Sequence, residues 1–316
     1  MAREIAFIEA LRAYATDPAA RGLMDDAAVL QLPGGDLVLT HDMLVEGVHY
    51  LPDDAPADVA WKLLAVNLSD LAAKGAEPLG ALLGYAMTDD AAWDAAFARG
   101  MGEAAEAMGL ALLGGDTVRM PAGAPRTLGL TAIGKAPPSG APSRAGARAG
   151  DRLWVSGTVG DTGLGLAIRQ GRMQGDAGLV ARYLRPAPRL TLGQALAPLV
   201  TAMADISDGL LIDARRIAAA SGCGMTIDLG AVPLSGALIA AAGSEVAARL
   251  AAATSGDDYE LLFTAPASRD SAIAAAASAA AVPVTPVGLC VAGEEITLTL
   301  EGETIALPDH LGWLHE

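Results

Sequence analysis

The spacing of apolar residues along this chain alternates between a helical period and short unbroken runs, and the two patterns predict different elements. Apolar residues recur at helical spacing within 58–71 and 90–108, and the second stretch ends at Gly109, a residue type that often closes a helix. Asp58 is the expected N-cap of the first helix. Short apolar runs bounded by turn residues predict strands at 27–30, 37–40, 80–87, 110–113 and 128–133. The turn at 33–36 predicts that the first two strands form a hairpin.

The second half repeats this mixture after a break rich in proline, glycine and alanine. Residues 136–150 contain Pro137-Pro138-Ser139-Gly140 and predict a linker. Beyond the linker we expect strands at 151–156, 225–229, 259–264 and 284–289, and helices at 161–170, 190–203, from Asp208 through 220, and at 267–281. With a further short helix at 3–16, the pattern predicts an α+β protein of two α/β domains, residues 1–135 and 151–316.

The composition allows a large core and excludes two classes of partner. The chain has 316 residues, of which 52% are hydrophobic, and this length suits two cores. Its formal net charge of −16 repels nucleic acid and anionic lipid, so neither is an expected partner. An acidic protein still binds a polyanion such as ATP when divalent cations bridge carboxylate and phosphate oxygens. The positions of the acids are therefore more informative than their number.

The cysteines and the N-terminal segment indicate where in the cell the protein is expected. Cys223 and Cys290 lack the spacing of metal ligands, and two cysteines in so long a chain predict buried free thiols. The first residues show no long apolar segment, and no stretch is apolar enough for a membrane span. We therefore expect a cytoplasmic protein with no membrane association.

Short acidic motifs recur where an apolar run meets an aspartate beside glycine, serine or threonine. The acids concerned are Asp25-Asp26, Asp42, Asp70, Asp116, Asp205, Asp208, Asp257-Asp258 and Glu260. Each is expected at a strand end or a helix start, where loops gather to build a site. Aspartate is a short, stiff ligand that suits small, octahedral Mg²⁺. Taken singly, such an aspartate can equally be a helix cap or a solvated acid, whereas a converging set predicts more than one metal ion.

The common nucleotide-binding signatures are absent from the sequence. It contains no G-x-x-x-x-G-K-[ST] motif, no G-x-G-x-x-G motif and none of the protein-kinase signatures. Gly114-Gly115-Asp116-Thr117 follows a predicted strand and would let the backbone approach a ligand closely, although the same residues suit a tight turn. An ATP site in this chain must be of another design.

Taken together, the motifs resemble those of the thiamine-monophosphate kinase family, in order and in spacing. The segments that carry the resemblance are Asp25–Val29, Thr40–His49, Lys62 with Asn67–Ala73, Gly114–Thr117, Asp205–Leu210 and Ser255–Leu261, with a looser match at Gly312–His315. The family belongs to the aminoimidazole ribonucleotide synthetase-like superfamily. The resemblance implies ATP-using enzymes with two α/β domains, whose N-terminal domains bind ATP and Mg²⁺ and pair their sheets in a homodimer.

The resemblance also implies an activity and assigns roles to residues of this sequence. The activity is phosphorylation of thiamine monophosphate to thiamine diphosphate by direct in-line transfer from ATP, with several Mg²⁺ ions and no catalytic side chain beyond the metal and phosphate ligands. The implied metal ligands are Asp26, Thr40, Asp42, Asp70, Asp116, Asp205 and Asp208. The implied ATP contacts are Gly115, Asp116, Arg144 and Ser207, and the implied substrate contacts are His49, Asp257 and Trp313.

Other interpretations of these residues remain open at this level. His49 lies between apolar residues and suits a core histidine, Trp313 suits simple packing, and Arg144 suits a solvated linker residue. The sequence departs from the family pattern at Met24 and His41 and in its tail, Trp-Leu-His-Glu. The alternative functions are another ATP-using enzyme of the superfamily with a different small acceptor, and a non-catalytic nucleotide-binding scaffold.

Overall fold

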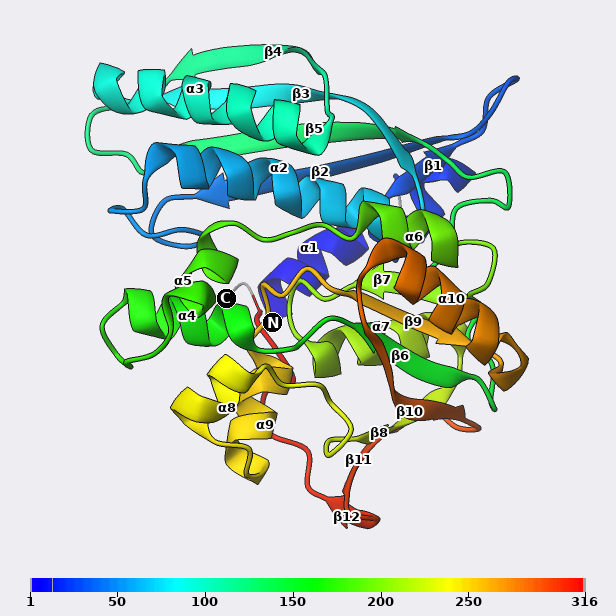
Figure 1. Ribbon diagram of the computed structural model, residues 1–316. Helices are drawn as coiled ribbons and strands as arrows, with labels where there is room; N and C mark the ends of the chain where they lie inside the picture. Colours follow the sequence, from blue (N-terminus) through cyan, green and yellow to red (C-terminus); the bar gives the residue numbers. More distant parts are fainter. Residues whose placement is uncertain (1, 13, 315–316) are drawn as a thin grey trace.

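The computed structural model describes residues 2–12 and 14–314, which form two lobes with one β-sheet each (Figure 1). The first lobe contains a five-stranded sheet in the order β1-β2-β5-β3-β4. The second contains a seven-stranded sheet in the order β12-β11-β8-β10-β6-β9-β7. The predicted mixed fold of two α/β halves is confirmed.

The first lobe covers only one face of its sheet with helices. Its elements are α1 (Ala2–Arg12), η1 (Pro18–Leu23), β1 (Ala28–Leu30), β2 (Leu37–Val45), α2 (Pro56–Ala73), β3 (Glu77–Met87), α3 (Ala91–Met108), β4 (Leu112–Arg119) and β5 (Thr127–Lys135). Neighbouring strands are antiparallel, except that β3 and β4 are parallel. Leu128 and Leu130 of β5 pack with Leu63 and Leu68 of α2 in a fully buried core. The helices α2 and α3 therefore bury one face of the sheet.

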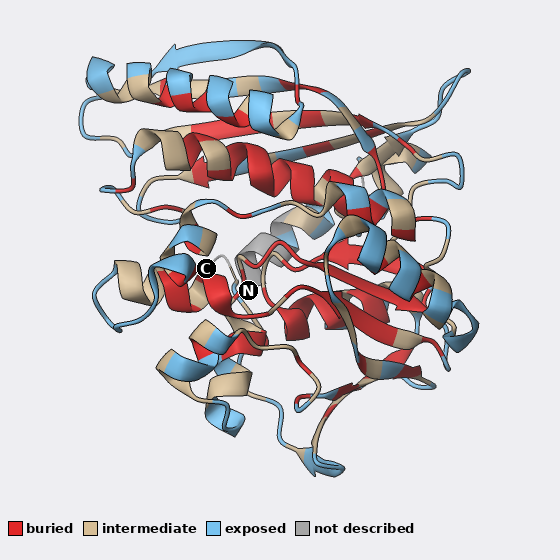
Figure 2. Ribbon diagram, viewed as in Figure 1, coloured by how far each residue is buried: buried red, intermediate tan, exposed pale blue. Residues whose placement is uncertain are grey.

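The opposite face of this sheet is open and carries apolar side chains. Met43, Leu82, Leu112 and Val118 each expose between 42% and 52% of their surface. The edge strand β4 is exposed along its whole length, as the pale strand at the top of Figure 2 shows. We refer to this surface, Met43 with Leu82, Leu112 and Val118, as the open face.

The second lobe covers both faces of its sheet with helices. Its elements are β6 (Arg152–Ser156), α4 (Asp161–Arg169), α5 (Ala177–Leu184), α6 (Leu190–Leu196), β7 (Ala202–Asp205), α7 (Leu210–Ser221), β8 (Gly224–Asp228), α8 (Gly236–Ala242), α9 (Val246–Thr254), β9 (Leu261–Ala265), η2 (Ala267–Arg269), α10 (Asp270–Ala280), β10 (Val284–Val291), β11 (Ile296–Leu300) and β12 (Glu303–Ile305). The helix α7 packs on one face through Leu211 and Ile217, and α6 and α10 pack on the other through Leu196 and Ile273.

The helix α2 lies between the two lobes and is buried nearly all round (Figures 1 and 2). Its C-terminal residues Ala72 and Ala73 join the core of the second lobe. Gly193 of α6 permits this contact, because a Cβ there would lie 2.0 Å from the carbonyl oxygen of Ala72. Polar side chains of α2 therefore have access to both lobes.

Most predicted elements are present, with corrections at their ends. The hairpin of β1 and β2 and the closure of α3 by Gly109, with a φ of 65°, are confirmed. Asp58 is not the N-cap of α2, because the helix starts at Pro56 with Ala55 as its N-cap. The helix expected at 190–203 ends at Leu196, and 202–205 form β7 instead. Pro198 explains the early end, since proline and the residue before it disfavour helix continuation.

Other differences between the predicted and the observed elements lie in segments whose hydrophobic pattern was too short to interpret. The strand expected at 110–113 extends through Gly114–Thr117 as β4, so those residues are not a turn. The elements α5, α8, α9, β11 and β12 were not predicted. Ala13, inside the helix expected at 3–16, lies outside the described residues. The domain limits expected at 135 and 151 stay a prediction.

The described residues confirm the expectation of two buried free thiols. Cys223 and Cys290 are both buried free thiols. No described helix combines the length and the apolar character that a bilayer crossing needs.

Candidate active site

Two adjoining clefts open where the lobes meet. The first, which we call the carboxylate cleft, has a volume of about 600 Å³. The second, which we call the adjoining cleft, has a volume of about 490 Å³. Asp42, Asp70, Ser207 and Asp208 line both clefts. Two ligands bound side by side would therefore share these four residues.

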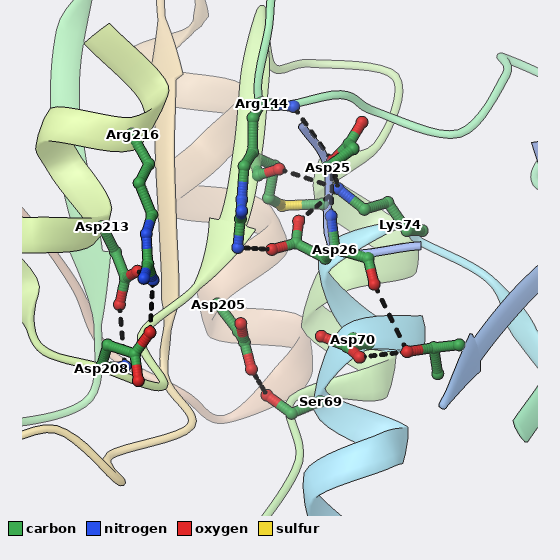
Figure 3. Close-up of polar contacts among 12 residues, drawn as sticks. Asp25, Asp26, Ser69, Asp70, Lys74, Arg144, Asp205, Asp208, Asp213 and Arg216 are labelled. Carbon is green, nitrogen blue, oxygen red and sulfur yellow. Dashed lines mark hydrogen bonds and ion pairs between the residues drawn. The ribbon is translucent and has the colours of Figure 1, made fainter. Parts of the chain in front are cut away.

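Three aspartates from distant parts of the sequence converge beside the carboxylate cleft. Asp26 precedes β1, Asp70 lies on α2, and Asp205 ends β7. One oxygen of each carboxylate lies within 4.8 Å of the others, so the three could hold a metal ion together. Figure 3 shows the three side chains directed toward a common space. The sequence prediction that these acids converge is met by the geometry.

Basic residues compensate one end of this cluster. The ammonium group of Lys74, which is completely buried at the end of α2, pairs with both Asp25 and Asp26 (Figure 3). The guanidinium group of Arg144 also pairs with Asp26. Burial alone would raise the pKa of Asp25, but the charge of Lys74 and its hydrogen bond bring that pKa well below its usual value. Asp25 is therefore a permanently charged partner of Lys74, a residue to which the sequence analysis gave no role.

Three other acids of the site lack such a basic partner. Within residues 2–12 and 14–314, no salt bridge reaches Asp42, Asp70 or Asp205. Burial and the charge of Asp26 raise the pKa of Asp205 to about 8. Burial and the charges of Asp26 and Asp208 raise the pKa of Asp42 to about 6. Burial and the neighbouring aspartates raise the pKa of Asp70 well above its usual value.

These raised pKa values have one physical cause. Several carboxylates lie close together and are buried away from water. Such carboxylates must take up protons or bind cations. One carboxylate oxygen of Asp205, Oδ1, is buried without a hydrogen-bond partner among the described residues. Oxygen ligands of this kind suit Mg²⁺, which takes one or two carboxylates together with phosphate oxygens. The residues present therefore fit a divalent cation.

Neutral side chains of the first lobe hold the acids in place. The Ser69 hydroxyl donates to Asp205 Oδ2 at 2.6 Å. The amide oxygen of Asn67 accepts from the backbone N–H of Asp42 at 3.1 Å. The Thr40 hydroxyl donates to Asp70. Thr40 thus lies where the sequence analysis expected it, although its hydroxyl is engaged with a carboxylate.

The loop before α7 brings a further acid into both clefts. Arg216 donates to Asp208 at 2.5 Å and to Asp213 at 2.7 Å, as Figure 3 shows. Asp213 also accepts from the backbone N–H groups of Asp208 and Gly209 at 3.1 and 3.2 Å. Asp208 is consequently fixed and already paired. Neither Arg216 nor Asp213 was predicted to support the site, because both lie in an ordinary amphipathic helix pattern.

His49, Asp257 and Trp313, the residues expected to contact the acceptor, all line the adjoining cleft. The backbone N–H of Val45 donates to His49 Nδ1 at 3.0 Å, so a neutral His49 carries its proton on Nε2. The backbone N–H of Trp313 donates to the carbonyl of Asp208 at 2.8 Å, and its ring is half exposed. The structure therefore brings together three residues that are far apart in the sequence.

Gly115 and Asp116 line neither cleft. They lie on β4, three strands away from β2, and at about 4.8 Å per strand this places Asp116 roughly 14 Å from β2. The register aligns Asp116 with Gly84, Gly129 and Met43, which puts it on the open face. Gly115 is explained locally, because a Cβ there would lie 1.9 Å from the carbonyl oxygen of Leu83. Within one chain these two residues stay apart from the acid cluster.

Comparison with known proteins agrees with this arrangement. Residues 24–136 match the family described as AIR synthase related protein, N-terminal domain. Residues 148–301 match the family described as AIR synthase related protein, C-terminal domain. The two matches together cover most of the chain and both lobes.

Several individual relatives are named thiamine-monophosphate kinase. The thiamine-monophosphate kinase of Caulobacter vibrioides is 44% identical over 306 residues, which cover 95% of this chain and 86% of the relative. A crystal structure of thiamine-monophosphate kinase from Stenotrophomonas maltophilia K279a is 38% identical, with a TM-score of 0.78, covering 95% of this chain and 96% of that one. A structure of AaThiL complexed with AMPPCP and TMP is 28% identical, with a TM-score of 0.84, covering 98% and 97%.

Proposed function

This chain belongs to the thiamine-monophosphate kinases of the AIR synthase related family, and from that membership we propose that its two clefts hold ATP and thiamine monophosphate side by side for direct phosphoryl transfer. The enzyme uses ATP as its co-substrate and converts thiamine monophosphate to thiamine diphosphate. The observation that carries the proposed geometry is the set of four residues, Asp42, Asp70, Ser207 and Asp208, that lines both clefts. Phosphate groups entering from the two sides would meet there.

ATP occupies the carboxylate cleft in this proposal. Arg144 and Ser207 line that cleft and would contact the phosphates, since a guanidinium group binds phosphate oxygens in a forked geometry. Asp26, Asp70 and Asp205 would hold Mg²⁺, with Asp42, Asp208 and Thr40 completing the coordination of further ions. When bound, Mg²⁺ offsets the charge of the phosphates and orients them for displacement. The uncompensated charge of the acids is what supports this assignment.

Thiamine monophosphate occupies the adjoining cleft. His49 and Asp257 would bind its polar groups, and Trp313 would stack on its cationic ring. The second pKa of a phosphate monoester is about 6, so the attacking oxygen is already ionised near neutral pH. No side chain is needed as a general base. This accounts for a site with many carboxylates and no cysteine among the described residues that line either cleft.

The transfer is a single displacement in this mechanism. An oxygen of the acceptor phosphate bonds to the γ-phosphorus of ATP, the bond from that phosphorus to the β–γ bridging oxygen breaks, and ADP leaves. Arg144 holds the donor, while His49, Asp257 and Trp313 hold the acceptor in line with it. A phosphorylated aspartate or histidine trapped during turnover would contradict the single displacement.

The homodimer and the role of Asp116 form part of the same proposal. The open face of the first sheet exposes apolar side chains that a second copy would cover. Asp116 lies on that face and cannot reach the acid cluster of its own chain. A partner packed on the open face would bring its own Gly115 and Asp116 toward the cleft, and this would account for both residues.

The direct test of the activity is to incubate the protein with MgATP and thiamine monophosphate and to quantify thiamine diphosphate and ADP. Equal amounts of the two products are expected. A protein that binds ATP and thiamine monophosphate without forming either product would instead be a scaffold.

The proposed role of Asp116 is tested by complementation between subunits. Asp42→Asn and Asp116→Asn homodimers are each expected to be inactive. A purified heterodimer of the two carries one intact site if Asp116 acts across the interface, so about half of the wild-type activity per dimer returns. An inactive heterodimer would show that Asp116 serves its own chain, whereas an active Asp116→Asn homodimer would show that Asp116 has no role.

A further inference from the structure

Lys62 is a buried cation that the phosphoryl-transfer site does not use. It lies on α2, exposes only 3% of its side chain and lines neither cleft. A buried ammonium group is costly unless it is paired and hydrogen-bonded. The partners of Lys62 therefore indicate what it does.

Lys62 contacts two residues that are expected to bind the acceptor. Its Nζ pairs with Asp257 Oδ2 at 2.7 Å and donates to the backbone carbonyl of His49 at 3.1 Å. His49 belongs to the first lobe and Asp257 to the second. Lys62 thus ties together two walls of the adjoining cleft that come from different lobes.

The other side of Lys62 is also fixed. Its Nζ lies 4.3 Å from the centre of the Tyr183 ring, a distance that suits a cation–π contact. The hydroxyl of Tyr183 donates to Asp54 Oδ2 at 2.9 Å. The ammonium group therefore has little freedom to leave Asp257.

Asp257 itself is held in an unusual conformation. Its φ is +62°, a region that residues with a side chain rarely adopt. Its second oxygen, Oδ1, accepts from the hydroxyl of Tyr259 at 2.9 Å, and its backbone N–H donates to the carbonyl of Ser207 at 2.7 Å. Each carboxylate oxygen keeps a further lone pair, and about a third of the side chain is exposed where it lines the cleft.

We propose that Lys62 is the positioning residue of the acceptor cleft, which fixes Asp257 and the His49 segment in the geometry that binds thiamine monophosphate. This inference rests on the proposed function, in which Asp257 and His49 contact the acceptor. Lys62 orients the carboxylate through a charge-assisted hydrogen bond and leaves its remaining lone pairs directed at the acceptor. It does not touch the nucleotide side, so its effect is confined to the acceptor.

The experiment compares Lys62→Met with Lys135→Met in steady-state kinetics and in binding of AMPPCP with Mg²⁺. Lys135 is an exposed lysine at the end of β5 and receives the same chemical change. Lys62→Met is expected to raise KM for thiamine monophosphate about tenfold, since it removes a hydrogen bond to a charged group, and to leave AMPPCP affinity within about twofold. Lys135→Met should leave both values unchanged.

A double-mutant cycle separates positioning from a general structural role. In an Asp257→Asn background, Lys62→Met should raise the acceptor KM by less than about threefold, because most of its target is already gone. If Lys62→Met alone does not fold, the double variant compared with Asp257→Asn still tests the expected limit of about threefold. Equal effects of Lys62→Met in the two backgrounds would overturn the proposal, as would a loss of AMPPCP affinity as large as the change in acceptor KM.

Failure of the inference is distinguishable from failure of the proposed function. If wild-type protein forms no thiamine diphosphate, the proposed function fails. If wild-type protein is active and Lys62→Met keeps the wild-type KM for the acceptor, only the role of Lys62 fails.

Discussion

The two clefts differ in how their carboxylates are satisfied. Beside the carboxylate cleft, Asp42, Asp70 and Asp205 are buried near one another with no salt bridge from the described residues, and their pKa values are raised. In the adjoining cleft, Asp257 has a lysine on one oxygen and a tyrosine hydroxyl on the other. Acids without partners require ions from outside the protein, whereas a partnered acid is already positioned.

This difference separates two tasks of the enzyme. In the proposed function the first cleft binds a polyanion, so its protein ligands would stay incomplete until cations arrive with the nucleotide. The second cleft would recognise an organic ring system in that proposal, which suits polar groups that are fixed in advance. Substitutions in the two clefts should therefore change different kinetic parameters.

The largest expected effect comes from Asp42→Asn in the carboxylate cleft. Loss of one metal-binding charge should lower kcat by about a thousandfold, because stabilisation of the transferring phosphoryl group depends on it. The exposed Asp89→Asn change, in a side chain that is 71% accessible, serves as the control and should have no effect. A kcat within threefold of wild type would remove Asp42 from the metal site.

Arg144→Met should produce the next largest effect, on the nucleotide side only. Removal of the guanidinium group is expected to raise KM for ATP by roughly 10–100-fold, since hydrogen bonds to charged groups are worth about 1.5–3 kcal/mol. The acceptor KM should change little. The control is Arg99→Met, an exposed change on α3. An unchanged KM for ATP would place Arg144 among structural residues that only neutralise Asp26.

Trp313→Leu tests the difference between the two clefts from the side of the acceptor. Loss of the ring is expected to raise KM for thiamine monophosphate about three- to tenfold, the range of a partly exposed cation–π contact, with KM for ATP unchanged. The same steady-state kinetic measurements give KM for thiamine monophosphate and KM for ATP. If neither KM moves, the side chain only packs against the clefts.

The smallest expected effect concerns stability without substrates. Mg²⁺ should raise the melting temperature of the wild-type protein by a few degrees, roughly 2–4 °C per kcal/mol, because it relieves repulsion among buried carboxylates. Asp70→Asn should melt at a higher temperature than wild type in EDTA and gain less from Mg²⁺. A wild-type melting temperature that is identical in EDTA and in Mg²⁺ would argue against an uncompensated acid cluster.

The sequence alone could predict that several of its acids converge, but not which ones or how they are supported. Asp26, Asp70 and Asp205 each stand where an apolar run meets a strand end or a helix, but Asp116 shares this local pattern and lies apart from the cluster. Lys62 and Lys74 were not given roles. Lys62 lies within a helix that is buried nearly all round, and Lys74 follows the last residue of that helix. A buried lysine requires an acidic partner, so the signal was present. Which acid each lysine meets depends on packing between the lobes.

The edge strand β4 shows a different limit of prediction. Gly114-Gly115 looked like a turn, because glycine pairs commonly mark turns. In the structure both glycines lie within a strand, and Gly115 is required by close contact with Leu83. The full exposure of β4 follows from its place at the edge of the sheet, and sheet order is not encoded in any local pattern.

The central claim is that carboxylates from both lobes gather magnesium around the ATP phosphates. The most direct test is a crystal structure with Mn²⁺ in place of Mg²⁺, AMPPCP and thiamine monophosphate, with anomalous scattering used to locate the metal. The account predicts more than one anomalous peak bounded by Asp26, Asp70 and Asp205 and the nucleotide phosphates. A nucleotide bound with no metal touching these three carboxylates would contradict it.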